Sequence, residues 1–337
     1  LGIQSSVAGV PSKQFQQIQQ YQMIVSENPS AANQDKAELE EVLKGQDIQA
    51  YQKIYSKTLD KDFKGKAGLQ TITLMMTEKE DLTPFIHLQH HQQELTLKDG
   101  VVITAKLAQL AGVKTGQTLE IEGKELKVAA IAENYVGHFI YMSQASYEQL
   151  YEQLPQANTY LVTLKDTSAT SIERQAGLLM NQAAVSSVVQ NASSIRLFDS
   201  VASSLNQTMT ILVIVSVLLA IVILYNLTNI NVAERIRELS TIKVLGFHNN
   251  EVTLYIYRET IVLSLVGIVL GLVSGFYLHQ FLIQMISPAT ILFYPKVGWE
   301  VYVIPVATVS IILTLLGFFV NHHLRKVDML EALKSVE

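Results

Sequence analysis

Residues 209–225 read MTILVIVSVLLAIVILY and are the first of three long apolar runs in this chain of 337 residues. The second run covers 261–286 and contains one ionisable side chain, and the third covers 301–320. A helix needs about 20 apolar residues to cross the hydrocarbon core of a bilayer. Buried soluble helices of this composition rarely occur three times in succession. The three runs therefore predict membrane spans.

Charge is distributed unevenly along the chain. Hydrophobic residues make up 49% of the sequence and charged residues only 16%, against about 25% charged in soluble proteins. Residues 1–200 hold 17 Lys and Arg with 22 Asp and Glu, whereas residues 201–337 hold 8 of each kind. The first part is thus typical of a mildly acidic soluble domain. The net charge of −5 gives no reason to expect nucleic-acid binding.

These two compositions predict two domains. We expect an extracytoplasmic α+β domain over 1–200, ending in a stalk helix, and a membrane α-helical domain over 201–337. The spans are expected at about 207–229, 258–286 and 301–321, with a connecting segment at 230–257 and a tail at 322–337.

The orientation in the membrane follows from the cations of the short connections. Loops on the cytoplasmic side carry an excess of Lys and Arg. The loop 231–259 contains four such residues and the tail 321–337 contains three, whereas the loop 287–300 contains only Lys296. We therefore expect 230–257 and the C-terminus to be cytoplasmic. Residues 1–200 must then lie outside, which also predicts a further span before the first residue given.

Helix and strand patterns alternate in the first 200 residues. Turn signals stand at Gly112, after AKLAQLA, and at Glu122–Lys124, between two strand patterns. Ser143 is a candidate N-cap. Helices are predicted at 35–44, 47–57, 105–111, 143–154, 168–183 and from about 193 onward. Strands are predicted at 69–76, 101–104, 118–121, 125–133, 139–143 and 159–164.

No catalytic or metal-binding pattern stands out. The chain has no cysteine, which excludes disulfides, thiolate metal sites and cysteine nucleophiles. His87, His90 and His91 lie close together, but no acidic or cysteine partner stands at ligand spacing, so a solvated polar segment is favoured over a zinc site. There is no Walker motif, G-x-S-x-G or HExxH. We predict a protein that is not itself an enzyme and needs no cofactor.

Two features of the membrane part indicate packing and docking. Gly267, Gly271 and Gly275 recur at every fourth position, which places them on one helix face and lets another helix approach closely. Residues 234–251, ERIRELSTIKVLGFHNNE, form a short amphipathic pattern in which Gly246 is placed as a C-terminal stop. The pair Arg235–Glu238 supports a helix there. Such a helix either lies on the membrane surface or docks in a groove on a cytoplasmic partner.

Three stretches resemble a known family. ERIRELSTIKVLGFHNNEV, the following RETIVLSLVGIVLGLVSG and the C-terminal LRKVDMLEALKSVE are similar to FtsX-like ABC transporter permeases of the MacB/LolC/FtsX superfamily. GVVITAKLAQLAGVKTGQTLEI resembles part of that family's periplasmic-core domain. The resemblance is most specific over 231–275. It also suggests the C-terminal half of a long Gram-positive permease.

The resemblance implies a role for particular residues. Arg237, Glu238 and Gly246 match the family's recurrent coupling positions, and Glu259 matches a glutamate at the cytoplasmic mouth of the second span. The full set implied to meet an ATPase is Arg235, Arg237, Glu238, Lys243, Leu245 and Gly246. The partners implied are an ABC ATPase subunit, a second permease half or homodimer partner, and the lipid bilayer.

The expected function is therefore that of a permease subunit in a cell membrane. Mechanotransmission would couple ATP hydrolysis by the partner to movements of the outer domain, and so export or extract a lipophilic, peptide or lipoprotein substrate. The alternative is a signalling subunit that activates a cell-wall hydrolase or senses antimicrobial peptides without transport. A membrane-anchored enzyme is disfavoured because no catalytic constellation is found outside the membrane.

Overall fold

The computed structural model describes residues 2–63, 67–78, 82–98, 100–235, 249–293 and 297–326. The chain divides into two compact units. The first, which we call the helical unit, comprises Leu1–Ser5, Ser204–Met285 and Pro295–Glu337. The second, the α/β unit, comprises Ser6–Ser203 and Ile286–Tyr294.

A mixed sheet forms the frame of the α/β unit. Its order is β11-β1-β10-β2-β3-β9-β6-β8-β7. Strands β3 and β9 run parallel, as do β6 and β8, and the other neighbours are antiparallel. The strands are β1 (Met23–Glu27), β2 (Ile48–Phe63), β3 (Gly68–Thr77), β6 (Val101–Thr104), β7 (Thr118–Ile121), β8 (Lys124–Ala132), β9 (His138–Ser143), β10 (Thr159–Leu164) and β11 (Val185–Gln190). A separate hairpin pairs β4 (Gln89–His90) with β5 (Gln93–Glu94).

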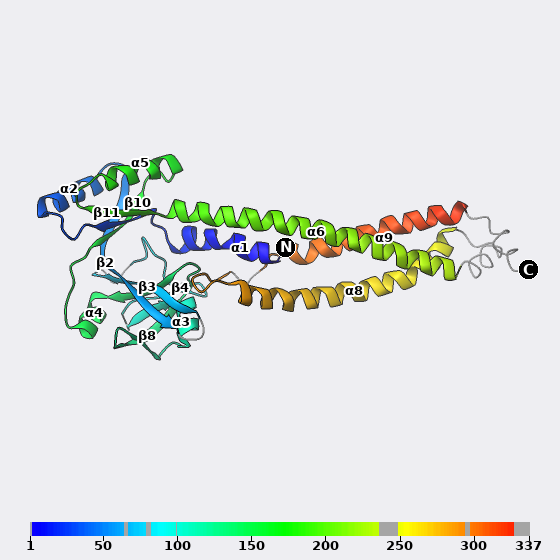
Figure 1. Cartoon of the computed structure of the whole chain (residues 1–337), viewed down its shortest axis with the longest axis horizontal. Coiled ribbons are helices and arrows are strands. Elements are labelled where there is room, and N and C mark those ends of the chain that lie inside the picture. The colour runs from blue at the N-terminus through cyan, green and yellow to red at the C-terminus, as the bar shows by residue number, and fades with distance from the viewer. Residues whose placement is uncertain are drawn as a thin grey trace, which may run out of the picture. The chain divides into compact units, whose positions relative to one another are not determined.

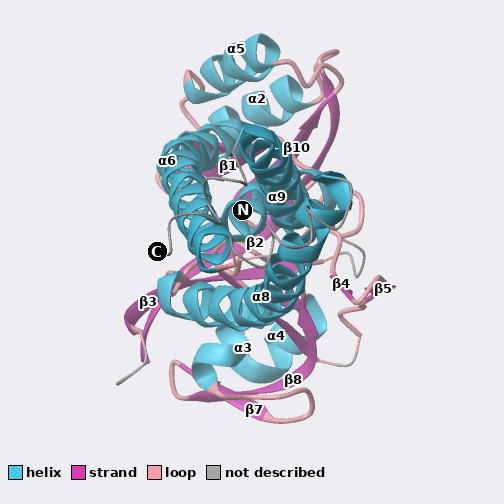
Figure 2. Cartoon of the chain, turned by 90° about the vertical axis from the view of Figure 1, so that its right-hand side faces the viewer, coloured by secondary structure: helices cyan, strands magenta, loops and turns pink. Residues whose placement is uncertain are grey.

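Two separate cores stabilise this unit, one for each half of the sheet. Helices α2 (Asn33–Leu43) and α5 (Ala169–Met180) lie side by side (Figures 1 and 2) and pack with β1, β10 and β11. Helices α3 (Ala105–Ala111) and α4 (Gln144–Tyr151) pack with β3, β6, β8 and β9. Among the described strands, only the long strand β2 takes part in both halves: it pairs with β10 over its first residues and with β3 over the rest. We call this transition, at Ile54 and Tyr55, the seam.

Several predicted caps and turns are confirmed. Gly112 ends α3 in the left-handed region, with φ of 70°, where a glycine carries no Cβ penalty. The backbone N–H of Ser146 donates to Ser143 Oγ over 3.2 Å and caps α4. Glu122 and Gly123 both have positive φ, 51° and 74°, as a two-residue hairpin turn between β7 and β8 requires.

One predicted helix is wrong. Residues 47–57 were expected to be helical, but they belong to β2. Ile48, Tyr51 and Tyr55 are spaced i, i+3 and i+7, which also fits one face of a helix, so the period alone was ambiguous. Their isoleucine and tyrosine side chains favour a strand. The hydrogen bonds offered by β10 and β3 decided the outcome.

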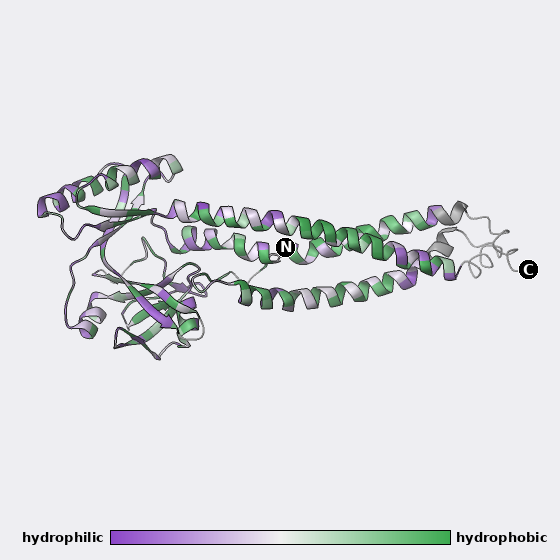
Figure 3. Ribbon diagram, viewed as in Figure 1, coloured by the Kyte–Doolittle hydropathy of each residue, from purple (hydrophilic) through white to green (hydrophobic). Residues whose placement is uncertain are grey.

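Three long helices make up most of the helical unit: α6 (Asn191–Glu234), α8 (Asn249–Ile286) and α9 (Glu300–Lys326). Each contains a window long and apolar enough to cross a membrane, with mean hydropathy of 2.8, 2.4 and 2.5. Apolar residues run along all three (Figure 3). The prediction of three long apolar helices together with an α/β domain is thus confirmed. Helix α6 begins in the α/β unit, directly after β11, at Asn191.

Two further segments complete the description. The chain begins with α1 (Gly2–Ser12), which continues into a short π-helix (Lys13–Ile18). The connection between α8 and α9 belongs to the α/β unit from Ile286 onward. There Ile291 forms a β-bridge with Val136.

Candidate functional site

A polar cluster joins α6 to α8 where the chain leaves α6. Arg235 directly follows the last residue of α6, and its Nη2 lies 2.6 Å from Glu259 Oε2 on α8. The side chains are 37% and 50% exposed. One turn earlier on α6, Asn231 Nδ2 donates to Thr260 Oγ1 over 3.4 Å, and Thr260 is fully buried. Charge and hydrogen bonding therefore tie the end of α6 to one face of α8.

Tyr257 extends the contact to α9. Its hydroxyl donates to the Leu313 carbonyl oxygen over 3.1 Å. Its ring is buried with Ile312 and Leu316, and it lies 3.6 Å from where a Cβ on Gly317 would be. Gly317 thus leaves room for the tyrosine ring beside α9. We call Asn231, Arg235, Tyr257, Glu259 and Thr260 the junction, because together they connect all three long helices.

Only part of this junction was expected from the sequence. Arg235 and Glu259 were singled out there separately, and the structure brings them into direct contact. Asn231, Tyr257 and Thr260 were missed because a single polar residue in a span gives no signal of its partner. The other residues named for ATPase coupling lie outside the described residues: Arg237, Glu238, Lys243, Leu245 and Gly246.

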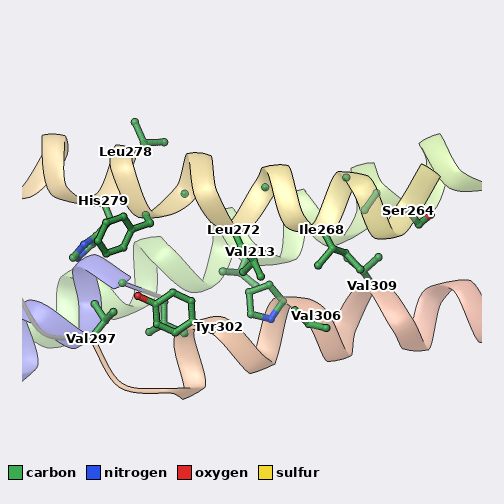
Figure 4. Close-up of a pocket in the computed structure, with 18 of the residues that line it drawn as sticks. Val213, Ser264, Ile268, Leu272, Leu278, His279, Val297, Tyr302, Val306 and Val309 are labelled. Atoms are coloured by element: carbon green, nitrogen blue, oxygen red, sulfur yellow. The ribbon is translucent and has the colours of Figure 1, made fainter. Parts of the chain in front are cut away.

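The three glycines of α8 face an apolar cavity of about 930 Å³ within the helical unit. Figure 4 shows Ile268 and Leu272 of α8 pointing towards Val306 and Val309 of α9 across this space. Apart from the neighbouring residues and adjoining backbone of α8 itself, a Cβ placed on Gly267, Gly271 or Gly275 would have no described atom within 4 Å. Among the described residues no helix therefore packs closely on this face. Its partner stays a prediction.

The segment from Ile286 to Phe293, which follows α8 in the chain, pairs with another part of the α/β unit. The Gly137 N–H donates to the Thr290 carbonyl, and the Leu292 N–H donates to the Tyr135 carbonyl, each over 2.8 Å. Two backbone hydrogen bonds on either side of the Val136–Ile291 bridge fix this segment to the chain just before β9. We call it the hook. Sequence patterns gave no indication of it, because it pairs residues more than 150 positions apart.

Two buried titratable groups lie beside the hook. Lys106 Nζ donates to Ser287 Oγ over 3.3 Å, and burial lowers the pKa of Lys106. His138 is 2% exposed, and neither ring nitrogen has a hydrogen-bond partner among the described residues. Burial lowers the pKa of His138, and the nearby charge of Lys106 lowers it further. The imidazole is therefore held in its neutral form near pH 7.

His90 and His91 lie at the small hairpin of β4 and β5, whereas His87 precedes β4 and its backbone N–H donates to the Ile18 carbonyl over 2.8 Å. The backbone N–H of His91 donates to Glu133 Oε1 over 2.9 Å, and the His90 and His91 rings stand 4.3 Å apart. In the parts of the chain that the structure describes, no three His, Cys, Asp or Glu side chains are grouped so as to hold a metal ion. The side chains of His90 and His91 are exposed on this turn.

The helical unit has the features of a multi-helix membrane domain, and comparison with known families identifies its type. Residues 210–329 match the family model of the FtsX-like permease C-terminal domain. This match confirms the resemblance to FtsX-like permeases that was drawn from 231–275. Together with three helices of spanning length, this match indicates a membrane protein and supports a role of the ABC permease type.

Solved structures also show similarities. The chain is similar to the periplasmic region of MacB from Actinobacillus actinomycetemcomitans, with 12% identity and a TM-score of 0.32, covering 54% of this chain and 94% of that chain. It is likewise similar to the extracellular domain of the noncanonic ABC-type transporter YknZ from Gram-positive bacteria, with 14% identity, a TM-score of 0.30, and 50% and 98% covered. No curated protein matches the chain significantly.

Proposed function

We propose that this chain is a permease subunit of an ABC complex, in which ATP hydrolysis by a partner ATPase moves the α/β unit on the other side of the membrane. The observation that carries the proposal is the match of residues 210–329 to the FtsX-like permease C-terminal domain. In this proposal residues 230–257 and the C-terminus are cytoplasmic, and residues 1–200 are extracytoplasmic. The ATPase docks on the set Arg235, Arg237, Glu238, Lys243, Leu245 and Gly246.

Helix α6 supplies the mechanical path. It is continuous from Asn191 to Glu234, and 44 helical residues span about 66 Å. A helix without an interruption transmits an axial displacement along its length. The junction would pass the same displacement to α8 and α9, since Arg235 pairs with Glu259 and Tyr257 bonds to Leu313. Displacement at the cytoplasmic end would thus reach β11 through α6 and the hook through α8.

The glycine face of α8 is proposed to receive a helix of a second permease half or of a homodimer partner. Small residues at every fourth position let two helix backbones approach closely in a bilayer. The support is that Gly267, Gly271 and Gly275 border a wide apolar space in which no described atom lies near them. The cargo proposed from the family resemblance is a lipophilic, peptide or lipoprotein substrate.

The test is co-purification of the chain with its ATPase. Glu238→Lys reverses a charge at the proposed docking surface, so we expect the variant to lose the ATPase and its ATP turnover. Glu173→Lys makes the same change on the exposed face of α5 and is expected to keep both. Hydrogen exchange of β9 and β10 should be the same in both variants. If Glu238→Lys still co-purifies and supports full turnover, the docking assignment is wrong.

A further inference from the structure

A polar cavity lies at the seam of the α/β unit. Its volume is about 440 Å³, within the range of small-molecule binding sites. Its walls come from β1, the first turn of α2, the middle of β2, the end of β3, the start of α4 and the segment 154–157. The charged side chains that line it are Glu27, Lys36, Lys53 and Glu78. Both halves of the sheet therefore contribute charge to one cavity.

The deepest charges neutralise each other. Glu27 has a side chain only 5% exposed, and its Oε1 lies 2.6 Å from Lys53 Nζ. The Tyr160 hydroxyl donates to the same oxygen over 2.8 Å. A buried carboxylate is stable only when it is paired and hydrogen-bonded in this way. The pairing of Glu27 with Lys53 is thus a fixed part of the wall, and neither charge is available to a ligand.

Two charged side chains in the cavity wall remain available to a ligand, Lys36 from one half of the sheet and Glu78 from the other. The nearest carboxylate oxygen to Lys36 Nζ is Glu27 Oε2 at 4.0 Å, which is the limit of an ion pair, and that carboxylate already binds Lys53. Glu78, at the end of β3, has no ion-pair partner among the residues that the structure describes. Amide side chains of Asn33, beside Lys36, and Gln144, at the start of α4, also line the space.

We propose that this seam cavity binds a small zwitterion with a free carboxylate and a free ammonium group, such as a short peptide. Lys36 and Asn33 would bind the carboxylate, and Glu78 and Gln144 would bind the ammonium. Charge-assisted hydrogen bonds of this kind are among the strongest polar contacts in proteins. A multiply charged anion is disfavoured because the carboxylate of Glu78, which has no ion-pair partner among the described residues, also lines the cavity. A purely apolar ligand would leave the lining charges unpaired.

The position of the cavity gives binding a mechanical consequence. Lys36 belongs to the half with the α2–α5 core, and Glu78 follows β3 in the half with the α3–α4 core. A ligand held at both ends would fix the two halves relative to each other. This step rests on the proposed permease function: the cavity then indicates that the substrate or signal of the permease is a small peptide and not a lipid. The binding itself does not depend on an ATPase.

Binding of trialanine to the full chain in detergent tests the proposal. Saturation-transfer NMR and titration compare trialanine, its N-acetyl form and its C-terminal amide. We expect the free peptide to bind at millimolar or lower concentration, and either blocked form to bind at least about ten-fold more weakly, which corresponds to about 1.4 kcal/mol. Equal binding of all three peptides would overturn the proposal. The absence of trialanine binding at about 10 mM would also overturn it, because binding that weak is on the order of the lowest useful affinity.

Two variants assign the ends of the ligand. Lys36→Gln should weaken trialanine binding and abolish the effect of C-terminal amidation, whereas Glu78→Gln should abolish the effect of N-acetylation. Lys44→Gln, on an exposed lysine at the other end of α2, is the matched control and should bind like wild type. Loss of binding in Lys44→Gln as well would contradict the assignment. Because no ATPase is present, a failed co-purification experiment leaves this result unaffected, and the two proposals fail separately.

Discussion

The α/β unit buries its apolar side chains in two cores, whereas the helical unit leaves large apolar side chains exposed. Leu126 in β8 is fully buried in the core beneath α3 and α4, whereas Leu270 in α8 is 62% exposed. The most apolar windows of α6 and α8 have no buried residue at all, and that of α9 is 17% buried. Water drives the α/β unit to close around its two cores. The helical unit instead satisfies its backbone within each helix and leaves its apolar surface for lipid.

The same substitution in the two units gives the largest expected difference. Leu126→Ala removes buried methyl groups from a closed core and should cost about 2–5 kcal/mol. Leu270→Ala removes them from an exposed helix face and should change stability by less than about 0.5 kcal/mol. Hydrogen exchange of β8 and of α8 in detergent measures both. Equal costs at the two positions would mean that α8 is packed as tightly as the sheet.

Lowering the pH below 6.5 should lower the stability of the α/β unit, and His138 is the expected cause. Burial and Lys106 hold its folded pKa below the ordinary value of 6.5. Above pH 6.5 both folded and unfolded chains carry a neutral imidazole, so His138 adds no pH dependence. As the pH falls below 6.5 the unfolded chain takes up the proton first, and stability falls until the pH reaches the lower folded pKa. Hydrogen exchange of β9 and the hook between pH 7.5 and 5.5 should show this loss.

The variant His138→Leu should remove that loss. It also removes two buried nitrogens without partners among the described residues, each of which costs about 1–3 kcal/mol if it stays unpaired. We therefore expect the variant to be at least as stable as wild type at pH 7.5. His91→Leu, at an exposed ring 83% open to solvent, is the control and should keep the wild-type pH dependence. Identical pH profiles for wild type and His138→Leu would exclude His138 as the cause.

The smallest effect is expected at the junction. Arg235 and Glu259 are partly exposed, so their ion pair should contribute only roughly 0.2–1 kcal/mol. Glu259→Gln and Arg235→Gln should each raise the exchange rate at the end of α6 by a similar small factor. The double variant should lose no more than either single one, because both remove the same contact. Additive losses would show that the two side chains act independently.

Local signals in the sequence predicted much of the fold. Length and hydropathy were sufficient to predict the three long apolar helices, because a run of this length and composition has few alternatives to a helix. Gly112 and the pair Glu122–Gly123 also marked their turns correctly, since positive φ restricts the residue types allowed there. The helix expected at 47–57 failed because its apolar spacing fits two periods, and only strands β3 and β10, distant in sequence, resolve it.

The candidate sites depended on contacts that no local pattern contains. Arg235 and Glu259 are 24 positions apart on different helices, and each was named for its own reasons. The hook joins Val136 to Ile291 through backbone groups, which carry no side-chain signature. The seam cavity is assembled from residues between Glu27 and Ala157 that meet only when β2 crosses from one half to the other.

The central claim is that nucleotide at one end of the helical unit moves the α/β unit. The chain has no cysteine, so Glu173→Cys in α5 and Gln280→Cys in α8 can be spin-labelled as the only thiols of this chain before the ATPase is added. Their distance distribution should be measured in the complex with its ATPase, before ATP and with ATP bound. A shifted distribution that returns after hydrolysis is the predicted result. Full ATP turnover with an unchanged distribution would contradict the claim.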